Sequence, residues 1–483
     1  MKTVTLVVVA LSFVGSLSAE PPKQSMGKIS FTRDVRPILQ QQCYGCHQPA
    51  KTNGVYVLTD YKSLRTPGET GKPSIVPGKP DQSYLIEEIK ITAGKAEMPK
   101  NREPLKPAEI ELIEKWILEG AADDSPTISS APEVTADHPP VYVAPPVVTS
   151  LAYSPDGSIL AVTGYHEVIL HDGEGKTILG RLVGLSERVQ SVAFSPNGKS
   201  LAVAAGNPGR SGEVQIWDVA KRNLRLSIPA GFDTIYGVSW SPDGTMVAFG
   251  ASDNIVRAVD ATTGKQMLFM GTHSDWIFGT VFSSDGKHLV SVSRDMSMKL
   301  TEVPTQRFVD NVTSITPGAL KGGIMAVDLR PMKEKKPAKV PDDTPGAKAE
   351  VYDELVCAGS DGKPRLYKMH REAKRVIGDD LNRIREYPVM AGRISSVRID
   401  REGKRFVAAA SLDGRGMVRI YDIETAKFVE AEAGTNPAPV YVAVFHPSGK
   451  SIVAAGFDGK LRFHDAETGK RLREVSAVPL SGK

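Results

Sequence analysis

The chain has 483 residues, 41% hydrophobic and 24% charged, so it is a globular protein too long for one core, and we expect two or more domains. Its 60 Lys and Arg residues against 56 Asp and Glu give a net charge of +4, which is too small to indicate nucleic-acid binding. Three cysteines are also too few for a disulfide scaffold.

The first 19 residues have the features of a secretory signal peptide. Lys2 gives a positive start, and an apolar stretch follows from residue 4 to 14. Small residues then offer a cleavage site at Ser16, Ser18 and Ala19. The apolar stretch is too short to cross a bilayer, and no later stretch reaches the roughly 18 apolar residues of a membrane helix. We therefore expect an exported, periplasmic protein without a transmembrane segment in its soluble mature chain.

A helix from about residue 31 is predicted to run into a cysteine motif. Apolar side chains recur at helical spacing at Phe31, Val35, Ile38 and Leu39. The sequence CYGCH follows at residues 43–47, so two thiols and an imidazole stand together at the end of this helix.

Three kinds of site could use Cys43, Cys46 and His47. A structural zinc ion needs four ligands, but residues 28–122 contain no further Cys or His. A thioredoxin-like dithiol is expected in a βαβ pattern, which is absent here. A plain disulfide between the two cysteines is the other possible use of the thiols. Covalent haem c uses all three side chains, because two thiols tether the porphyrin and the histidine ligates the iron. The sequence favours one haem c over zinc or a dithiol.

A second axial ligand for the iron is predicted at Met98. It stands in the sequence KAEMPKN about fifty residues after the motif, and Pro99 stiffens the loop behind it. A thioether is a soft ligand, and His/Met ligation raises the reduction potential and suits electron transfer. A second helix should follow Met98, beginning at Pro107 and ending near Gly120.

These segments resemble the planctomycete-type cytochrome c domain over most of residues 29–122. The resemblance rests on FTRDVRPILQQQCYGCH, PSIVPGKPDQSYLIEEI and MPKNREPLKPAEIELIEKWILEGA. It implies covalent haem on Cys43 and Cys46, with His47 and Met98 as axial ligands. The chain departs from the family's pattern in Asn53-Gly54-Val55, where a paired Gly is common, and in Met98-Pro99-Lys100, where Met-Pro-Pro is common.

Residues 123–147 form a proline-rich linker, and a repeating pattern begins at residue 148. Each unit has a strand, a tight turn and a second strand. Six of the turns carry the glycines Gly157, Gly198, Gly244, Gly286, Gly403 and Gly449, which supply the positive φ of a hairpin. A further unit has an insertion, residues 332–349, in place of the short turn. We also expect residues 140–144 to add a strand to the last unit.

Each of the seven units has a third strand that ends at a common place. One of these ends is the Trp217-Asp218 pair typical of WD40 repeats, and the spacing over residues 148–476 is near the WD40 period of roughly 40–45 residues. The sequence therefore predicts two domains. An all-α cytochrome c-like domain (28–122) should precede an all-β, seven-bladed WD40-like propeller (148–476). Three residues of this region should be structural: Cys357, as a buried thiol, and His171 and His464, in the Trp position. His273 resembles the Gly-His element that holds a WD40 blade by hydrogen bonding.

The loops before the inner strands are predicted to form a protein-docking face. They contribute Arg188, Asp233, Tyr236, Asp275, Trp276, Lys321 and Arg393, and exposed Trp and Arg are typical interface anchors. The favoured function is an electron-transfer protein whose propeller docks a redox partner. The alternatives are a haem-based scaffold that senses redox state or a gas, and an enzyme with a substrate or second cofactor on the propeller. We find no catalytic constellation in residues 148–483, so an electron carrier is favoured over an enzyme.

Overall fold

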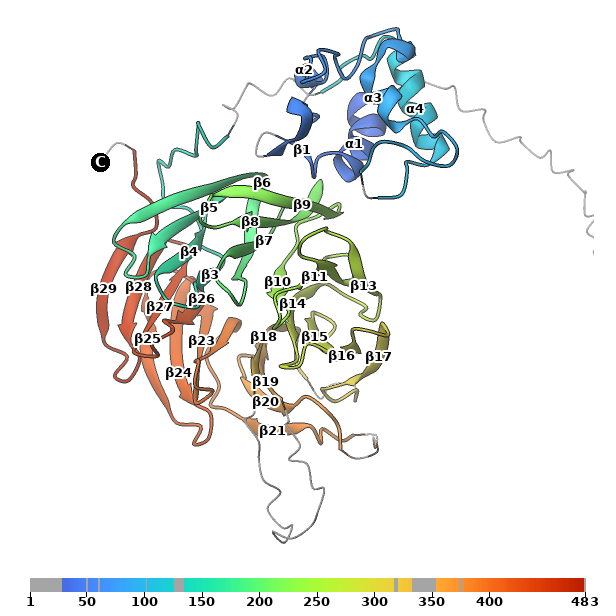
Figure 1. The fold of residues 1–483 in the computed structure, drawn as a ribbon. Helices are drawn as coiled ribbons and strands as arrows, with labels where there is room; N and C mark the ends of the chain where they lie inside the picture. The colour runs from blue at the N-terminus through green and yellow to red at the C-terminus, as the bar shows by residue number, and fades with distance from the viewer. Residues whose placement is uncertain are drawn as a thin grey trace, which may run out of the picture.

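A computed structural model describes residues 28–48, 51–59, 61–100, 102–125, 134–316, 320–331, 353–372, 374, 376 and 378–481. The predicted signal peptide (1–19), the predicted insertion (332–349) and residues 126–133 of the linker lie outside the described residues. A small helical N-terminal domain lies beside a larger ring of β-sheets, the repeat domain (Figure 1). No helix in the described part of the chain is long and apolar enough to cross a membrane.

The N-terminal domain consists of short helices joined by loops. They are η1 (Phe31–Val35), α1 (Arg36–Gln42), η2 (Asn53–Val55), α2 (Tyr61–Leu64), η3 (Pro80–Gln82), α3 (Tyr84–Ile89) and α4 (Pro107–Leu118). The hydroxyl of Ser30 accepts a hydrogen bond from the Arg33 N–H and so caps the first turn of η1. As predicted, α4 begins at Pro107, and the chain leaves it through Gly120 at φ +99°.

The prediction of an all-α domain is wrong in one detail. Two short strands, β1 (His47–Gln48) and β2 (Lys51–Thr52), pair antiparallel directly after the cysteine motif. The chain reverses at this point, and its backbone N–H and C=O groups pair across the reversal because a helix can no longer satisfy them.

An apolar core holds the helices of the N-terminal domain together. Trp116 of α4 is fully buried, and its ring lies 5.2 Å from that of Phe31, centroid to centroid, in a stacked arrangement. The Tyr61 hydroxyl donates to the Ala121 carbonyl oxygen at 2.6 Å and ties the end of α4 to α2. Full burial of one such aromatic side chain contributes about 1.5–3 kcal/mol, so these contacts fix η1 and α2 against α4.

The repeat domain contains five four-stranded antiparallel sheets and one seven-stranded sheet, each with its strands in chain order. The seven-stranded sheet holds β3 (Leu151–Tyr153), β4 (Ile159–Thr163), β5 (Tyr165–Asp172), β6 (Ile178–Phe194), β7 (Ser200–Asn207), β8 (Ser211–Asp218) and β9 (Asn223–Gly231). Strand β6 has 17 residues and belongs to two successive sequence units, because it pairs with both β5 and β7.

The four-stranded sheets follow one another around the ring. The first two hold β10 (Gly237–Trp240), β11 (Met246–Gly250), β12 (Val256–Asp260) and β13 (Gln266–Met270), then β14 (Ile277–Phe282), β15 (His288–Ser293), β16 (Met298–Glu302) and β17 (Arg307–Asn311). The third holds β18 (Ile324–Arg330), β19 (Glu354–Gly359), β20 (Arg365–Lys368) and β21 (Arg383–Glu386). The last two hold β22 (Arg393–Ile399), β23 (Arg405–Leu412), β24 (Arg415–Asp422) and β25 (Phe428–Asn436), then β26 (Val440–Phe445), β27 (Ser451–Gly456), β28 (Lys460–Asp465) and β29 (Arg471–Ser476).

The predicted hairpin turns are confirmed. All six glycines have positive φ, between +69° and +77°, at Gly157, Gly198, Gly244, Gly286, Gly403 and Gly449. At Asp156, hydrogen bonds from Ser154 and Ser158 hold the carboxylate against the turn and lower its pKa to about 2. The turn residues therefore fix the register of the first two strands of these units.

The two ends of the repeat domain meet and close the ring. The inner strand β26 contacts β3, and the Val148 N–H donates to the Gly456 carbonyl oxygen at 2.9 Å. Residues 140–144 do not form the expected strand, since neither Pro140 nor Pro145 can donate a ladder hydrogen bond. Tyr142 is instead buried in the core of the last sheet, where its carbonyl oxygen accepts from the Ser481 N–H at 2.8 Å.

The residues assigned structural roles in the repeats are buried. Cys357 is 2% exposed, and burial raises the pKa of its thiol to about 12. His171 and His464 are 2% and 0% exposed. His273 shares hydrogen bonds through its two ring nitrogens with Asp295 at 2.9 Å and with Ser291 at 2.8 Å, so it ties together strands of one sheet.

Candidate haem-attachment site

The cysteine motif lies on a tight turn at the end of α1. The Cys43 N–H donates to the Leu39 carbonyl oxygen at 2.8 Å and completes the helix. The Cys46 and His47 N–H groups then donate to the Cys43 carbonyl oxygen at 3.0 and 3.1 Å. These hydrogen bonds hold the two thiols and the imidazole within one turn, next to the apolar core.

The two thiols have different surroundings. Cys43 is partly buried and packs against the core of the N-terminal domain, whereas Cys46 is exposed, and neither is in a disulfide. Burial raises the pKa of the Cys43 thiol to about 12. A dithiol oxidoreductase needs a thiol with a lowered pKa, so this environment does not suit thiol exchange at Cys43. Within the described residues, no group of three or more His, Cys, Asp or Glu side chains gathers as a metal cluster.

The imidazole of His47 is oriented by a backbone carbonyl. Its Nδ1 lies 3.3 Å from the Tyr56 carbonyl oxygen, and since a carbonyl can only accept, Nδ1 carries the proton. The neutral ring then has its lone pair on Nε2, the nitrogen that an iron ion requires. Tyr56 is fixed in turn, because its hydroxyl donates to the Lys72 carbonyl oxygen at 2.8 Å.

Met98 borders the same apolar core as Cys43. It is partly buried, and its N–H donates to the Glu88 carbonyl oxygen at 2.9 Å, which ties this loop to the end of α3. Cys43 and Met98 thus border one apolar core, and Cys46 and His47 lie on the turn that begins at Cys43. This donor set fits haem c, which requires two thiols, axial ligands and an apolar crevice.

Five of the predicted docking residues form one group on the repeat domain. Trp276 stacks on Tyr236, with ring centroids 5.6 Å apart, and Asp275 accepts from the Arg294 guanidinium at 2.8 Å. Burial raises the pKa of Tyr236 and the charge of Asp233 raises it further, whereas the charge of Arg188 opposes this shift. We call Arg188, Asp233, Tyr236, Asp275 and Trp276 the aromatic patch.

The other two predicted docking residues are not part of the aromatic patch. Lys321 and Arg393 are exposed and precede or begin the inner strands β18 and β22. Within the described residues, no hydrogen bond, ion pair or ring contact joins either of them to the patch.

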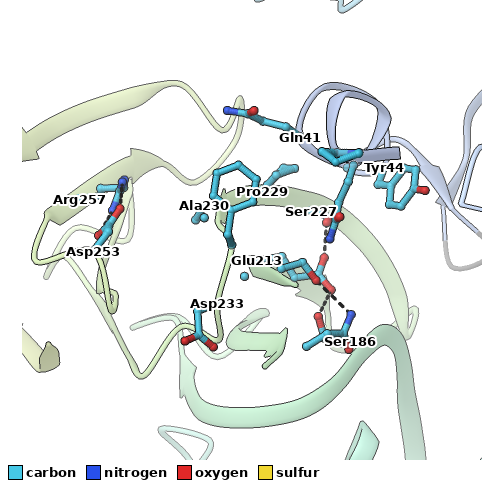
Figure 2. Close-up of a pocket in the computed structure, with 18 of the residues that line it drawn as sticks. Gln41, Tyr44, Ser186, Glu213, Ser227, Pro229, Ala230, Asp233, Asp253 and Arg257 are labelled. Carbon is cyan, nitrogen blue, oxygen red and sulfur yellow. Dashed lines mark hydrogen bonds and ion pairs between the residues drawn. The ribbon is translucent and has the colours of Figure 1, made fainter. Parts of the chain in front are cut away.

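The N-terminal domain contacts the repeat domain through the motif loop itself (Figure 2). Gly45 lies so close to β9 that a Cβ atom there would be 2.3 Å from the Ser227 carbonyl oxygen and 3.2 Å from Pro229 Cδ. The Gln40 side chain donates to the Arg210 carbonyl oxygen at 3.2 Å. The chain's own N-terminal domain therefore lies against the repeat domain at this point.

A cleft of about 550 Å³ lies beside this contact. Tyr44 and Gly45 line it from the N-terminal domain, and Glu213 and the patch residue Asp233 line it from the repeat domain. Sequence reasoning missed Glu213. The available signal was that Glu213 lies in a third strand, two residues before Gln215. At the position of Gln215, most other units have Arg or Lys.

The fold and the site define a cytochrome c-like domain joined to a domain of repeated sheets, and comparison with known families specifies both parts. The model of the Planctomycete cytochrome C family matches residues 43–102. The model of the WD domain, G-beta repeat, matches residues 176–218, 225–260, 264–301 and 433–465. The chain is thus a fusion of a planctomycete cytochrome c domain with WD40 repeats, as its motifs predict.

Curated relatives match parts of the chain. A WD repeat-containing protein 91 homolog of Dictyostelium discoideum is 30% identical over 109 residues, 22% of this chain and 14% of that protein. Actin-interacting protein 1-2 of Arabidopsis thaliana is 30% identical over 161 residues, 32% of this chain and 26% of that protein. Periodic tryptophan protein 2 of Arabidopsis thaliana is 20% identical over 283 residues, which are 59% of this chain and 27% of that protein. The chain thus spans about a quarter or less of the length of these relatives.

Among solved structures, the computationally designed Ika8 protein matches with a TM-score of 0.47 and 17% identity, over 70% of this chain and 90% of that one.

Proposed function

We propose that this protein is an exported c-type cytochrome that transfers electrons to or from a partner protein. One haem c is bound covalently through Cys43 and Cys46, with His47 and Met98 as its axial ligands. The observation that carries this proposal is the arrangement of the site. The partly buried Cys43 and Met98 border one apolar core, and the Tyr56 carbonyl orients His47 beside them.

Each of these residues has a role in that function. The haem, when bound, supplies a one-electron iron couple. Cys43 and Cys46 hold it covalently, and the hydrogen bond of Nδ1 to Tyr56 keeps Nε2 of His47 unprotonated for the iron. Met98 contributes a soft sulfur, which favours ferrous iron and raises the potential. The apolar core beside them excludes water from the site.

The domain division completes the proposal. Residues 1–19 direct export, and residues 28–122 carry the haem. Residues 123–147 link this haem domain to the repeat domain at 148–476. We take the ring to have seven blades, with the seven-stranded sheet as two of them joined through β6. The support for this count is that β6 is shared by two sequence units. The aromatic patch, with its partly exposed rings and the ion pair of Asp275 with Arg294, is the docking surface for the redox partner.

A second candidate function is a scaffold in which the haem senses redox state or a small gas. The contact between Gly45 and β9 favours it, because a change at the haem-bearing loop would act directly on the repeat domain. The two functions differ at Met98. A stable ligand suits electron transfer, whereas a displaced or absent one suits sensing.

The first test is an optical spectrum, oxidised and reduced, of the full chain exported from a host with haem-maturation machinery. We expect a c-type spectrum that stays with the denatured polypeptide and a thioether–iron band that Met98→Ala abolishes. Met267→Ala, at an exposed position of the repeat domain, should keep the band. Covalent haem without a thioether–iron band in the unsubstituted protein, and with a spectrum unchanged in Met98→Ala, would shift the assignment to sensing. A chain without bound haem would refute both functions.

A further inference from the structure

The cleft beside the motif loop has the size of a small-molecule site. Its volume of about 550 Å³ lies within the range of roughly 300–1,000 Å³ typical of ligand pockets. Tyr44 and Gly45 form one wall, and strands β8 and β9 provide the residues of the opposite wall, among them Glu213 and Ser227 (Figure 2).

A buried carboxylate with only neutral donors lies in this cleft. Glu213 is 7% exposed, and its carboxylate accepts from the Ser186 hydroxyl at 2.5 Å, the Gln215 amide at 2.7 Å and the Ser227 hydroxyl. Among the described residues, no ion pair involves Glu213. All three donors are neutral, so the carboxylate has no cationic partner among the described residues.

The other buried acidic side chains of the repeat domain have different partners from those of Glu213. Four of them pair with arginine: Glu167 with Arg181, Glu354 with Arg330, Asp400 with Arg405, and Glu432 with Arg471. The fifth, Asp353, accepts from the backbone and hydroxyl of Ser284 and does not line this cleft. Within the described residues, Glu213 alone combines burial, the lack of an ion pair and a place in the cleft.

The sequence repeat shows which cation is missing. The third strand of five other units has a cation three residues before its end, at Arg257, Lys299, Arg365, Arg419 and Arg462. Gln215 of β8 holds this position in the second unit. This unit therefore lacks the cation that five other units supply from the same strand position.

Aromatic rings in the cleft indicate which chemical class of cation it would bind. Phe232 and Phe269 both line the cleft and are 65% and 46% exposed. The guanidinium of Arg257 lies 5.2 Å from the centroid of Phe269 and forms an ion pair with Asp253. Arg257 is therefore not the cationic partner of Glu213. Phe232 lines the same cleft as Glu213, and an aromatic face attracts a weakly hydrated organic cation.

We propose that this cleft binds a small organic cation, a primary amine or a guanidinium, whose charge pairs with Glu213. Phe232 covers the carbon skeleton of the ligand, and Ser186, Gln215 and Ser227 hold the carboxylate in place beside the cleft. The opposite wall is the loop between the two motif cysteines, so an occupied cleft lies directly behind Tyr44 and Gly45. This site goes beyond the proposed electron-transfer function and does not depend on it.

Calorimetric titration of the full chain with agmatine, which carries both an amine and a guanidinium, tests the proposal. We expect binding to the unsubstituted protein and at least tenfold weaker binding to Glu213→Gln, which keeps the shape but removes the charge. Glu167→Gln is the matched control, since it occupies the same strand position of the preceding unit and should leave the affinity unchanged. Butane-1,4-diol, of similar length but neutral, should not bind.

A second variant covers the case in which Glu213→Gln fails to fold. Phe232→Ala changes a side chain that is 65% exposed, so the fold should tolerate it, and we expect several-fold weaker agmatine binding. No heat of binding with agmatine at millimolar concentration, or equal affinity in the unsubstituted chain and either cleft variant, would overturn the assignment. The titration needs no electron transfer, so its failure and a failure of the haem proposal are separate results.

Discussion

Replacing Gly45 with alanine should separate haem attachment from the docking of the two domains. The glycine does not have positive φ, so alanine fits the local turn between the motif cysteines. Its Cβ would nevertheless lie 2.3 Å from the Ser227 carbonyl oxygen, and reaching an ordinary contact of 3.4 Å requires the two backbones to part by roughly 1.1 Å. Overpacking of this kind costs about 1–3 kcal/mol, which weakens the docked arrangement roughly 5- to 150-fold.

Small-angle scattering and amide hydrogen exchange measure this effect directly. In Gly45→Ala we expect a larger radius of gyration and faster exchange over residues 227–231 of β9, with an unchanged c-type spectrum. Gly271→Ala is the matched control, because a Cβ there meets no atom within 4 Å and the backbone needs no left-handed conformation. If Gly45→Ala scattered and exchanged like the control, the contact between the motif loop and β9 would not hold the domains together in solution.

Two further predictions concern buried carboxylates of the repeat domain. Burial raises the pKa of Glu167 to about 7, although Arg181 and Tyr142 oppose the shift, so its contribution to stability is full below about pH 4.5 and is lost as the pH rises through about 7. Glu167→Gln should therefore raise the free energy of unfolding at about pH 8 by up to about 3 kcal/mol. At about pH 4.5 it should change this free energy little. An equal effect on the thermal midpoint at both pH values would contradict this. At Asp295, burial alone would raise the pKa, but hydrogen bonds from His273 and Ser297 hold it well below its usual range, so the stabilisation is present at neutral pH and lost in strong acid. Asp295→Asn should lower the free energy of unfolding at neutral pH by about 2–3 kcal/mol, seen as a lower thermal midpoint that the exposed Asp413→Asn does not reproduce.

Much of the local structure was predictable because it depends on neighbouring residues. The helix into Cys43 follows from apolar spacing, and the start of α4 follows from Pro107, whose fixed φ suits a first turn. The hairpin glycines were predictable for the same reason, since positive φ is a property of one residue.

The contacts between distant segments could not be predicted in this way. Gly45 meets Ser227 across more than 180 residues, and no spacing pattern within either domain encodes that contact. The segment 140–144 has the β-branched and aromatic residues of a strand, but Pro140 and Pro145 cannot donate ladder hydrogen bonds and the Tyr142 carbonyl accepts from the Ser481 N–H instead. Burial of Glu213 likewise depends on Ser186 and Ser227, which come from different strands of the same sheet.

The closure of the ring has a consequence for the order of events during synthesis. Tyr142 binds Ser481, and the two lie 339 residues apart, so the ring cannot close until almost the whole chain has left the ribosome. Pairings of such long sequence separation form slowly, because the loop between them must first be closed. The N-terminal domain can fold from its own short-range contacts long before that. The turn that holds the cysteine motif can therefore form while β9, which later lies against Gly45, is not yet part of a closed ring.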